Sequence, residues 1–245
     1  MSKMTWHGTG EREIEAGVSD VALFPMGSST YADGVAWNGV TAINENPSGA
    51  DITDLYADNI KYASLQSAEK FGFGIEAYTY PDEWSECDGS KEVITGVFVG
   101  QQARKPFGLV YKTQLGDENH PGMDKGFKLN IVWNSTAAPS GRSYTTINDN
   151  PDAISFSWDA NSTPVPVTIS SQKKTTCKMT IKSTDFMTTG TTPVINEKLQ
   201  LLLDTLYGRD ADSTVNPAVT ALTPKLVDPD TAIYILTNGT MPPTT

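Results

Sequence analysis

Cysteine and histidine are scarce in this chain, with two of each among 245 residues. Cys87 and Cys177 cannot form a disulfide framework, and no C-x-x-C pair is present. We therefore expect two free thiols in a reducing compartment. His7 and His120 have no second ligand at metal-binding spacing, and a catalytic triad that needs histidine would have to use one of them. Metal-dependent and histidine-dependent catalysis are both disfavoured.

Long apolar runs are also missing. No segment approaches the roughly 18 consecutive apolar residues that a membrane-spanning helix needs. The N-terminal sequence MSKMTWHGTGEREIEAG has no apolar core of the kind found in secretory signals. We expect a protein that stays in the compartment where it is made and that does not insert into a membrane.

Basic residues are few, with 18 Lys and Arg against 29 Asp and Glu, which gives a formal net charge of -11. Proteins that grip nucleic acid do so with basic side chains on phosphates, so tight nucleic-acid binding is disfavoured. An acidic surface past which DNA slides without binding is compatible with this charge. Acidity that serves only solubility is equally compatible, so charge alone decides little.

Catalytic and phosphate-binding motifs are absent as well: the sequence has no P-loop, no G-x-S-x-G and no G-x-G-x-x-G. DENHPGMD (117–124) offers oxygens and one imidazole for a metal ion, but its spacing is not that of an EF-hand. YPDEWSECDG (80–89) offers clustered carboxylates, yet a glycosidase needs its pair across a cleft. We read both as solvated loops, and we expect no cofactor, no metal and no enzyme activity.

Alternation of apolar and polar residues dominates what is present. Three segments show it clearly, which predicts half-buried β-strands. The positions that share one face are Phe107, Leu109, Tyr111, Thr113 and Leu115; Phe127, Leu129, Ile131 and Trp133; and Ile154, Phe156 and Trp158. We expect Trp133 and Trp158 in the core. Further predicted strands are 55–65, 70–80, 165–170, 176–182 and 231–236, with weaker signals at 18–24 and 35–43.

One segment has helical periodicity. Ile195, Leu199, Leu202, Leu203 and Leu206 form a single apolar stripe, which predicts an amphipathic helix over residues 193–207. Thr192 and Pro193 suit its cap and first turn, and Gly208 suits its end.

A helix among many strands has to cover a sheet face. We therefore predict a mainly β fold, a β-sandwich or partial barrel with one flanking helix. Three regions are expected: residues 1–30 as an N-terminal arm and first strand, 31–208 as the β domain, and 209–245 as an extended C-terminal arm with a last strand.

A longer pattern identifies a family. The stretches YADGVAWNGVTAINENPSGADITDLYADNIKYASLQSAEKFGFGIEAYTYPDEWSECDGS (31–90), GQQARKPFGLVYKTQLGDE (100–118) and GFKLNIVWNSTAAPSGRSYTTINDNPDAISFSWDANSTPVPVT (126–168) carry it. Together they resemble the major tail proteins of long-tailed bacteriophages, the subunits that stack into the tail tube. The resemblance covers most of the chain, and from residue 209 onward no family pattern is recognised.

The resemblance implies a function. It implies a structural virion protein that forms stacked hexameric rings around the tape-measure protein, with each copy adding strands to an inner β-barrel. Double-stranded DNA would pass through the lumen without specific binding, in a long non-contractile tail with tail-tip and terminator proteins as further partners. The protein would lie in the host cytoplasm during assembly and in the virion tail afterwards.

The family's block of inner strands and a protruding loop corresponds to residues 50–80. On that basis the expected contacts for ring formation, stacking or the lumen are Asp51, Asp54, Asp58, Lys61 and Glu69. The alternative function is a monomeric β-sandwich that binds carbohydrate or a receptor, since the chain has nine Tyr and five Trp.

Overall fold

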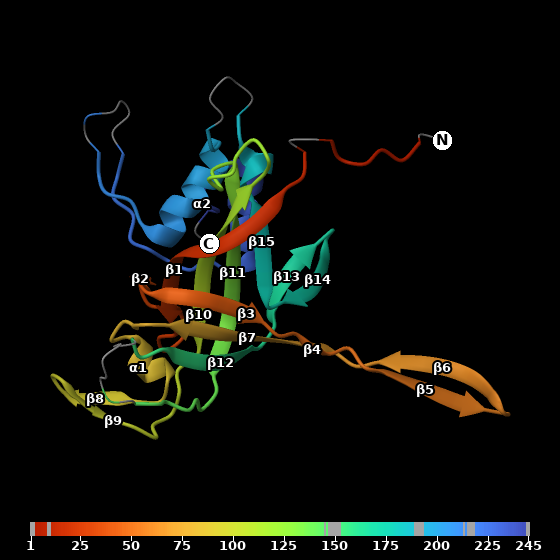
Figure 1. Cartoon of the computed structure of the whole chain (residues 1–245), viewed down its shortest axis with the longest axis horizontal. Coiled ribbons are helices and arrows are strands. Elements are labelled where there is room, and N and C mark those ends of the chain that lie inside the picture. The colour runs from red at the N-terminus through yellow and green to blue at the C-terminus, as the bar shows by residue number, and fades with distance from the viewer. Residues whose placement is uncertain are drawn as a thin grey trace.

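The structure is a computed structural model that describes residues 3–8, 11–144, 146, 153–188, 194–212, 214 and 219–243. The protein is mainly β, as predicted (Figure 1). Its strands are β1 (Ile14–Pro25), β2 (Val35–Ala36), β3 (Val40–Glu45), β4 (Ser48–Gly49), β5 (Ile52–Ala57), β6 (Ile60–Gln66), β7 (Glu69–Ala77), β8 (Lys91–Ile94), β9 (Val97–Val99), β10 (Phe107–Gly116), β11 (Gly126–Ala137), β12 (Phe156–Ser162), β13 (Val165–Ile169), β14 (Gln172–Thr176) and β15 (Lys178–Lys182). The helices are α1 (Trp84–Cys87), a 3-10 turn (Ser183–Phe186), α2 (Glu197–Tyr207) and α3 (Pro229–Asn238).

One antiparallel sheet organises the molecule. Its strands follow the order β2-β1-β10-β11-β12-β7-β3, and β15 also pairs with β11. The first half of β11 pairs with β15 and its last residues pair with β12. The sheet therefore turns over along β11 and forms two layers, β1-β10-β11-β15 and β12-β7-β3. Among the described residues its end strands, β2 and β3, do not pair with each other, so the sheet is not closed.

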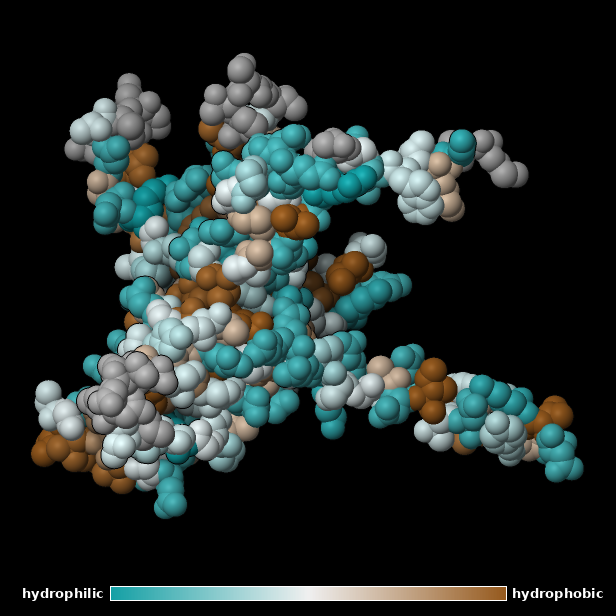
Figure 2. Space-filling model, viewed as in Figure 1, coloured by the Kyte–Doolittle hydropathy of each residue, from teal (hydrophilic) through white to brown (hydrophobic). Residues whose placement is uncertain are grey.

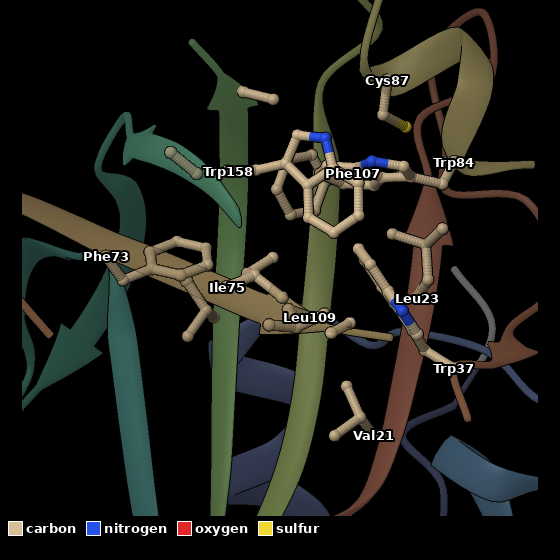
Figure 3. Close-up of a cluster of buried hydrophobic side chains, with 14 of the residues drawn as sticks. Val21, Leu23, Trp37, Phe73, Ile75, Trp84, Cys87, Phe107, Leu109 and Trp158 are labelled. Atoms are coloured by element: carbon tan, nitrogen blue, oxygen red, sulfur yellow. The ribbon is translucent and has the colours of Figure 1, made fainter. Parts of the chain in front are cut away.

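The first core lies between these two layers. The β1-β10 side contributes Leu23 and Leu109, and the β7-β12 side contributes Ile75 and Trp158. Figure 3 shows Trp158, Phe107 and Trp84 gathered at one end of this cluster. Trp84 comes from α1, and its ring lies 4.9 Å from Phe107 and 5.4 Å from Trp158, centroid to centroid. The buried aromatic rings thus join the two layers, and Trp158 lies in the core, as predicted.

The second core lies on the opposite face of β1-β10-β11-β15. There α2 and α3 cover the strands with Leu199, Leu202, Leu206 and Ile235. Trp133 is buried in this core, as predicted, and its indole N–H donates to the Val227 carbonyl at 2.8 Å. The layer order is therefore sheet, core, sheet, core and helices.

The helical segment differs from its prediction at its start. Helix α2 begins at Glu197, after the N-cap Asn196, whose side chain accepts a hydrogen bond from the Leu199 N–H. The predicted start at residue 193 is therefore wrong, while Thr192 and Pro193 lie outside the described residues. The predicted end is confirmed, because Gly208 follows Tyr207 with a φ of +84°.

The last predicted strand, 231–236, is wrong. These residues belong to helix α3, whose N-cap Asp228 accepts from the Thr231 N–H at 2.9 Å. Pro229 occupies the first turn, and Gly239 ends the helix in the left-handed region. Ala232 and Ile235 are buried against α2, so this part of the expected extended arm packs on its own subunit. The domain limits at residues 30 and 208 stay predictions.

Most other predicted strands are present, and segment 18–24 lies within β1. The predicted strand 35–43 is wrong, because these residues form two strands, β2 and β3, at opposite ends of the sheet order. Segments 70–80, 165–170 and 176–182 correspond to β7, β13 and β15. Segment 55–65 is not one strand but a hairpin, β5–β6, because the chain reverses at Asp58 and Asn59. Three hairpins, β5–β6, β8–β9 and β13–β14, form separate two-stranded sheets outside the main one.

A projecting arm as the candidate assembly surface

The hairpin β5–β6, here called the arm (residues 52–66), extends away from the two-layered body. Figure 1 shows it as a continuation of β3 and β7, reached through β4. At its base Ser48 and Gly49 pair with Lys70 and Glu69. The strands of one body layer thus run directly into the arm and fix its direction.

The sequence-predicted contact residues all gather here. Asp54, Asp58 and Lys61 lie on the arm, and Asp51 and Glu69 lie at its base. The Asp51 N–H donates to the Ser67 hydroxyl at 2.9 Å, which closes the base of the hairpin. The structure therefore brings the five residues onto one projecting element, and their role in assembly stays a proposal.

The tip of the arm is a tight two-residue turn. Asp58 and Asn59 have φ angles of +52° and +62°, and Asp and Asn are the residues that tolerate this left-handed region best after glycine. Two consecutive positive φ values are those of a type I′ turn, whose twist matches that of the flanking strands. Asp58 is therefore explained by turn geometry without a direct contact role.

The two faces of the arm differ in chemistry. Residues paired directly across an antiparallel ladder share a face, so the register assigns every side chain. One face carries Ile52, Asp54, Tyr56, Lys61, Ser64 and Gln66. The opposite face carries Thr53, Leu55, Ala57, Ile60, Ala63 and Leu65 and has no charge. A register shift between Leu55 and Tyr56 leaves Tyr62 outside this pairing.

The charged groups of the first face find their partners within the arm itself. The Lys61 Nζ lies 2.8 Å from the Asp54 carboxylate, and the Ser64 hydroxyl donates to the same carboxylate at 2.7 Å. The hydrogen bond from Lys61, followed by that from Ser64, lowers the pKa of Asp54. Because both groups are in water, this pair orders the face more than it stabilises the fold.

The uncharged face has no cover. Leu55, Ile60 and Leu65 are 43%, 64% and 58% exposed. Figure 2 shows apolar residues on the arm well away from the body. A two-stranded hairpin in water is marginally stable, and apolar residues with no core beneath them mark an interaction surface. The uncharged face of the arm is therefore a candidate interaction surface.

The body layer that continues into the arm has a polar outer face. On β3, β7 and β12 the side chains turned away from the first core include Asn44, Glu76, Ser157, Asp159 and Asn161. The Asn44 amide donates to the Glu76 carboxylate at 3.0 Å. Gly72 and Gly74 lie among these side chains, so this part of the face has few projecting atoms. The carboxylates on the face are those of Glu76 and Asp159.

The two acidic loops considered as catalytic or metal sites hold carboxylates in contacts within the chain. Asp117 is buried, contrary to the solvated loop expected, because it accepts from the N–H groups of Asn119 and His120 and lies 2.9 Å from the Lys125 Nζ. These contacts, led by the hydrogen bond from Lys125, hold the pKa of Asp117 well below its ordinary value. In the other loop Asp88 pairs with Arg104 and Arg142.

The short helix α1 fixes that second loop to the body. Trp84 and Cys87 are buried in the first core, and burial raises the pKa of the Cys87 thiol to about 12. Such a thiol is not a nucleophile at neutral pH. Cys87 and Cys177 are both free, as the sequence predicted.

Sequence reasoning missed a second uncovered hairpin, β8–β9. Val93, Ile94, Val97, Phe98 and Val99 are all exposed there. Its strands of four and three residues are too short for a periodicity argument, and only Gly96, with a φ of +80°, signals the turn. Two hairpins with exposed apolar side chains therefore project from one body (Figure 2).

Other site classes find little support in the described part of the chain. There, no helix is long and apolar enough to cross a membrane. Within the same residues, no three His, Cys, Asp or Glu side chains are grouped so as to hold a metal ion. No protein-family model matches the sequence, and no curated protein matches it.

Proposed function

We propose that this chain is a structural subunit of a phage tail tube. It would polymerise as stacked hexameric rings in a virion tail and form the conduit through which double-stranded DNA enters the host cell. The observation that carries the proposal is the uncharged, uncovered face of the arm, with Leu55, Ile60 and Leu65 at its centre. The resemblance of residues 31–168 to major tail proteins supplies the kind of assembly.

The arm requires a partner on physical grounds. Burying about 25 cal/mol per Å² of apolar surface favours any arrangement that takes this face out of water. The body of the same copy does not provide a cover, since among the described residues β5 and β6 pair only with each other and the hairpin extends away from the body (Figure 1). A neighbouring copy in a stacked ring is the partner that the proposal assigns.

The same reasoning assigns a lumen surface. If the arm reaches the next ring, β3 and β7 run along the tube, and their layer lies on the side opposite α2 and α3. Its outer face carries Glu76 and Asp159, and Lys70 lies on the same side of β7 near the base of the arm. Carboxylates on the wall repel DNA phosphates, so the duplex passes without adhering.

The remaining partners follow from the resemblance. A tape-measure protein would fill the lumen during assembly, and tail-tip and terminator proteins would lie at the ends of the tube. Catalysis and a cofactor have no part in this function, which rests on contacts between copies.

The lumen assignment makes a prediction about transport. The double variant Glu76→Gln/Asp159→Asn should assemble as the wild type does but slow DNA passage, because the wall loses its repulsive charge. Phage particles carrying the variant can be tested by timing DNA ejection after receptor addition. Substitution of the exposed Asp124 by Asn, at a loop remote from this face, is the matched control. Unchanged ejection in the double variant would remove Glu76 and Asp159 from the lumen.

The alternative, a carbohydrate-binding or receptor-binding monomer, has weaker support. A groove of about 920 Å³ lies between β1, β2, the loop that follows β2, and α2. Its Trp37 is only 2% exposed and its Tyr207 ring is covered by the Lys112 ammonium, so neither offers an open stacking face to a sugar. Most of the large aromatic side chains are used in the cores.

Electron microscopy of the concentrated, purified protein tests the proposal. Hollow rings or tubes of uniform width are expected. Discrete monomers at every concentration would contradict the proposal, and monomers that also bind glycans would establish the alternative.

A further inference from the structure

The second uncovered hairpin offers a receptor for the first. In β8–β9, Lys91 pairs with Val99 and Ile94 pairs with Val97, so these four side chains share one face. Phe98 and Glu92 occupy the other face, which borders a hollow of about 330 Å³ beside α1. The outward face is therefore apolar, with one cation at its edge.

We propose that the outward face of β8–β9 (Lys91, Ile94, Val97 and Val99) receives the uncharged face of the arm from a second copy of this chain. This inference rests on the proposed function and names the surface at which one ring would grip the next. It goes beyond that function because it pairs two particular hairpins, one of which carried no prediction.

Geometry favours a second copy over the same copy. Figure 1 shows the arm and β8–β9 at opposite ends of the longest axis of the molecule. Two different surfaces at opposite ends make a head-to-tail contact, which propagates from copy to copy instead of closing a pair. A tube that grows by stacking needs a contact of this kind.

Charge favours this pairing over contact between two arms. Residues 51–66 contain Asp51, Asp54, Asp58 and Lys61, which sum to a formal charge of -2. Residues 91–99 contain Lys91 and Glu92, which sum to zero. Contact between two arms would bring two hairpins of like net charge together, whereas an arm on β8–β9 meets a neutral hairpin with Lys91 at its rim.

Chemistry of the two faces matches as well. The arm presents Leu55, Ile60 and Leu65, and β8–β9 presents Ile94 and two valines, all exposed. Branched aliphatic side chains dominate both faces, with Thr53 on the arm and Lys91 on β8–β9 as their polar members, which is the composition of an interface centre. The intramolecular Asp54–Lys61 pair stays on the solvent side of the arm.

A disulfide cross-link between two singly substituted proteins tests the contact. One protein carries Leu65→Cys and the other Val97→Cys, both in a Cys177→Ser background, with Cys87 left in place because it is buried. Oxidation of a mixed assembly should give a cross-linked dimer that neither protein forms alone. Ser64→Cys, on the opposite face of the arm, replaces Leu65→Cys as the matched control and should not cross-link.

The outcomes separate the inference from the function. Tubes that form without the Leu65–Val97 cross-link overturn the inference and leave the tube proposal standing. Dimers formed by the Leu65→Cys protein alone show arm-to-arm contact and also overturn it. If the unsubstituted protein also forms no tubes, the tube proposal itself is contradicted.

Amide hydrogen exchange on the unsubstituted protein is a second test, independent of any variant. Between monomer and assembly, exchange should slow by at least about tenfold in both 52–66 and 91–99. Protection of the arm with unchanged exchange at 91–99 would overturn the inference.

Discussion

The body and the arm of this protein use the same kind of strand to opposite effect. In the body, alternating side chains such as Ile75 and Trp158 face a core that the chain itself supplies. In the arm, Leu55 and Leu65 alternate in the same way and face water. The comparison teaches that alternation predicts which residues share a face but not which molecule covers that face.

The largest difference is expected in stability. Trp158→Ala should lower the free energy of unfolding by about 3–5 kcal/mol, because the cavity left between the two layers cannot fully collapse. Tyr62→Ala, an arm aromatic that is 76% exposed, should change it by no more than about 0.5 kcal/mol. Urea unfolding of the two variants measures both values. A comparable loss in both would mean that the arm belongs to the folding unit of the body.

Acid sensitivity should also belong to the body. The pKa of Asp117 is held below its ordinary value of 3.8, chiefly by the hydrogen bond from Lys125. A carboxyl with a lowered folded-state pKa stabilises the protein above its unfolded-state pKa, and the contribution fades as the pH falls below about 4. Asp117→Asn should therefore be less stable than the wild type at neutral pH, and the difference should narrow on acidification.

Asp124→Asn is the matched control for this pH experiment. Asp124 lies in the same loop but is exposed, so its substitution should leave the pH profile of thermal unfolding unchanged. An Asp117→Asn profile parallel to that of the wild type would refute the assigned role of the Lys125 contact.

A smaller effect is expected at the helix that covers the second core. Asn196→Ala removes the side chain that caps the Leu199 N–H at 3.0 Å and should cost about 1 kcal/mol. Asn196→Ser keeps a capping oxygen and should stay within a few tenths of a kcal/mol, since Ser caps nearly as well as Asn. Denaturant unfolding separates the two, and equal losses would show that the cap contributes nothing specific.

The strands of the body could be predicted because their apolar side chains alternate along the strand and are buried by other parts of the same chain. Segments around Leu109, Ile131 and Trp158 met this condition. The same argument gave a wrong prediction for residues 231–236, because Thr, Ile and Tyr favour strands. The stop and start signals around them, Asp228 before Pro229 and Gly239 at the end, indicate a helix and decide the outcome.

The hairpin that carries the candidate site was not predicted from the sequence, and the role of its residues in assembly stays a prediction. The resemblance named residues 50–80, and the structure places the five named residues along one hairpin, from its base at Asp51 and Glu69 to its tip at Asp58. The reversal at Asp58 and Asn59 and the register shift after Leu55 then decide which side chains share a face. Register is set by turn geometry and by a single extra residue, so a sequence pattern alone does not fix it. The β8–β9 hairpin gave no periodic signal at all.

Sedimentation velocity over a concentration series tests the central claim most directly, that the uncharged face of the arm holds copies together. The double variant Leu55→Ser/Leu65→Ser should remain folded by circular dichroism and sediment as a monomer, while the wild type forms large assemblies. The control Ser64→Ala/Gln66→Ala, on the opposite face, should assemble as the wild type does. A folded Leu55→Ser/Leu65→Ser protein that assembles normally would contradict the account.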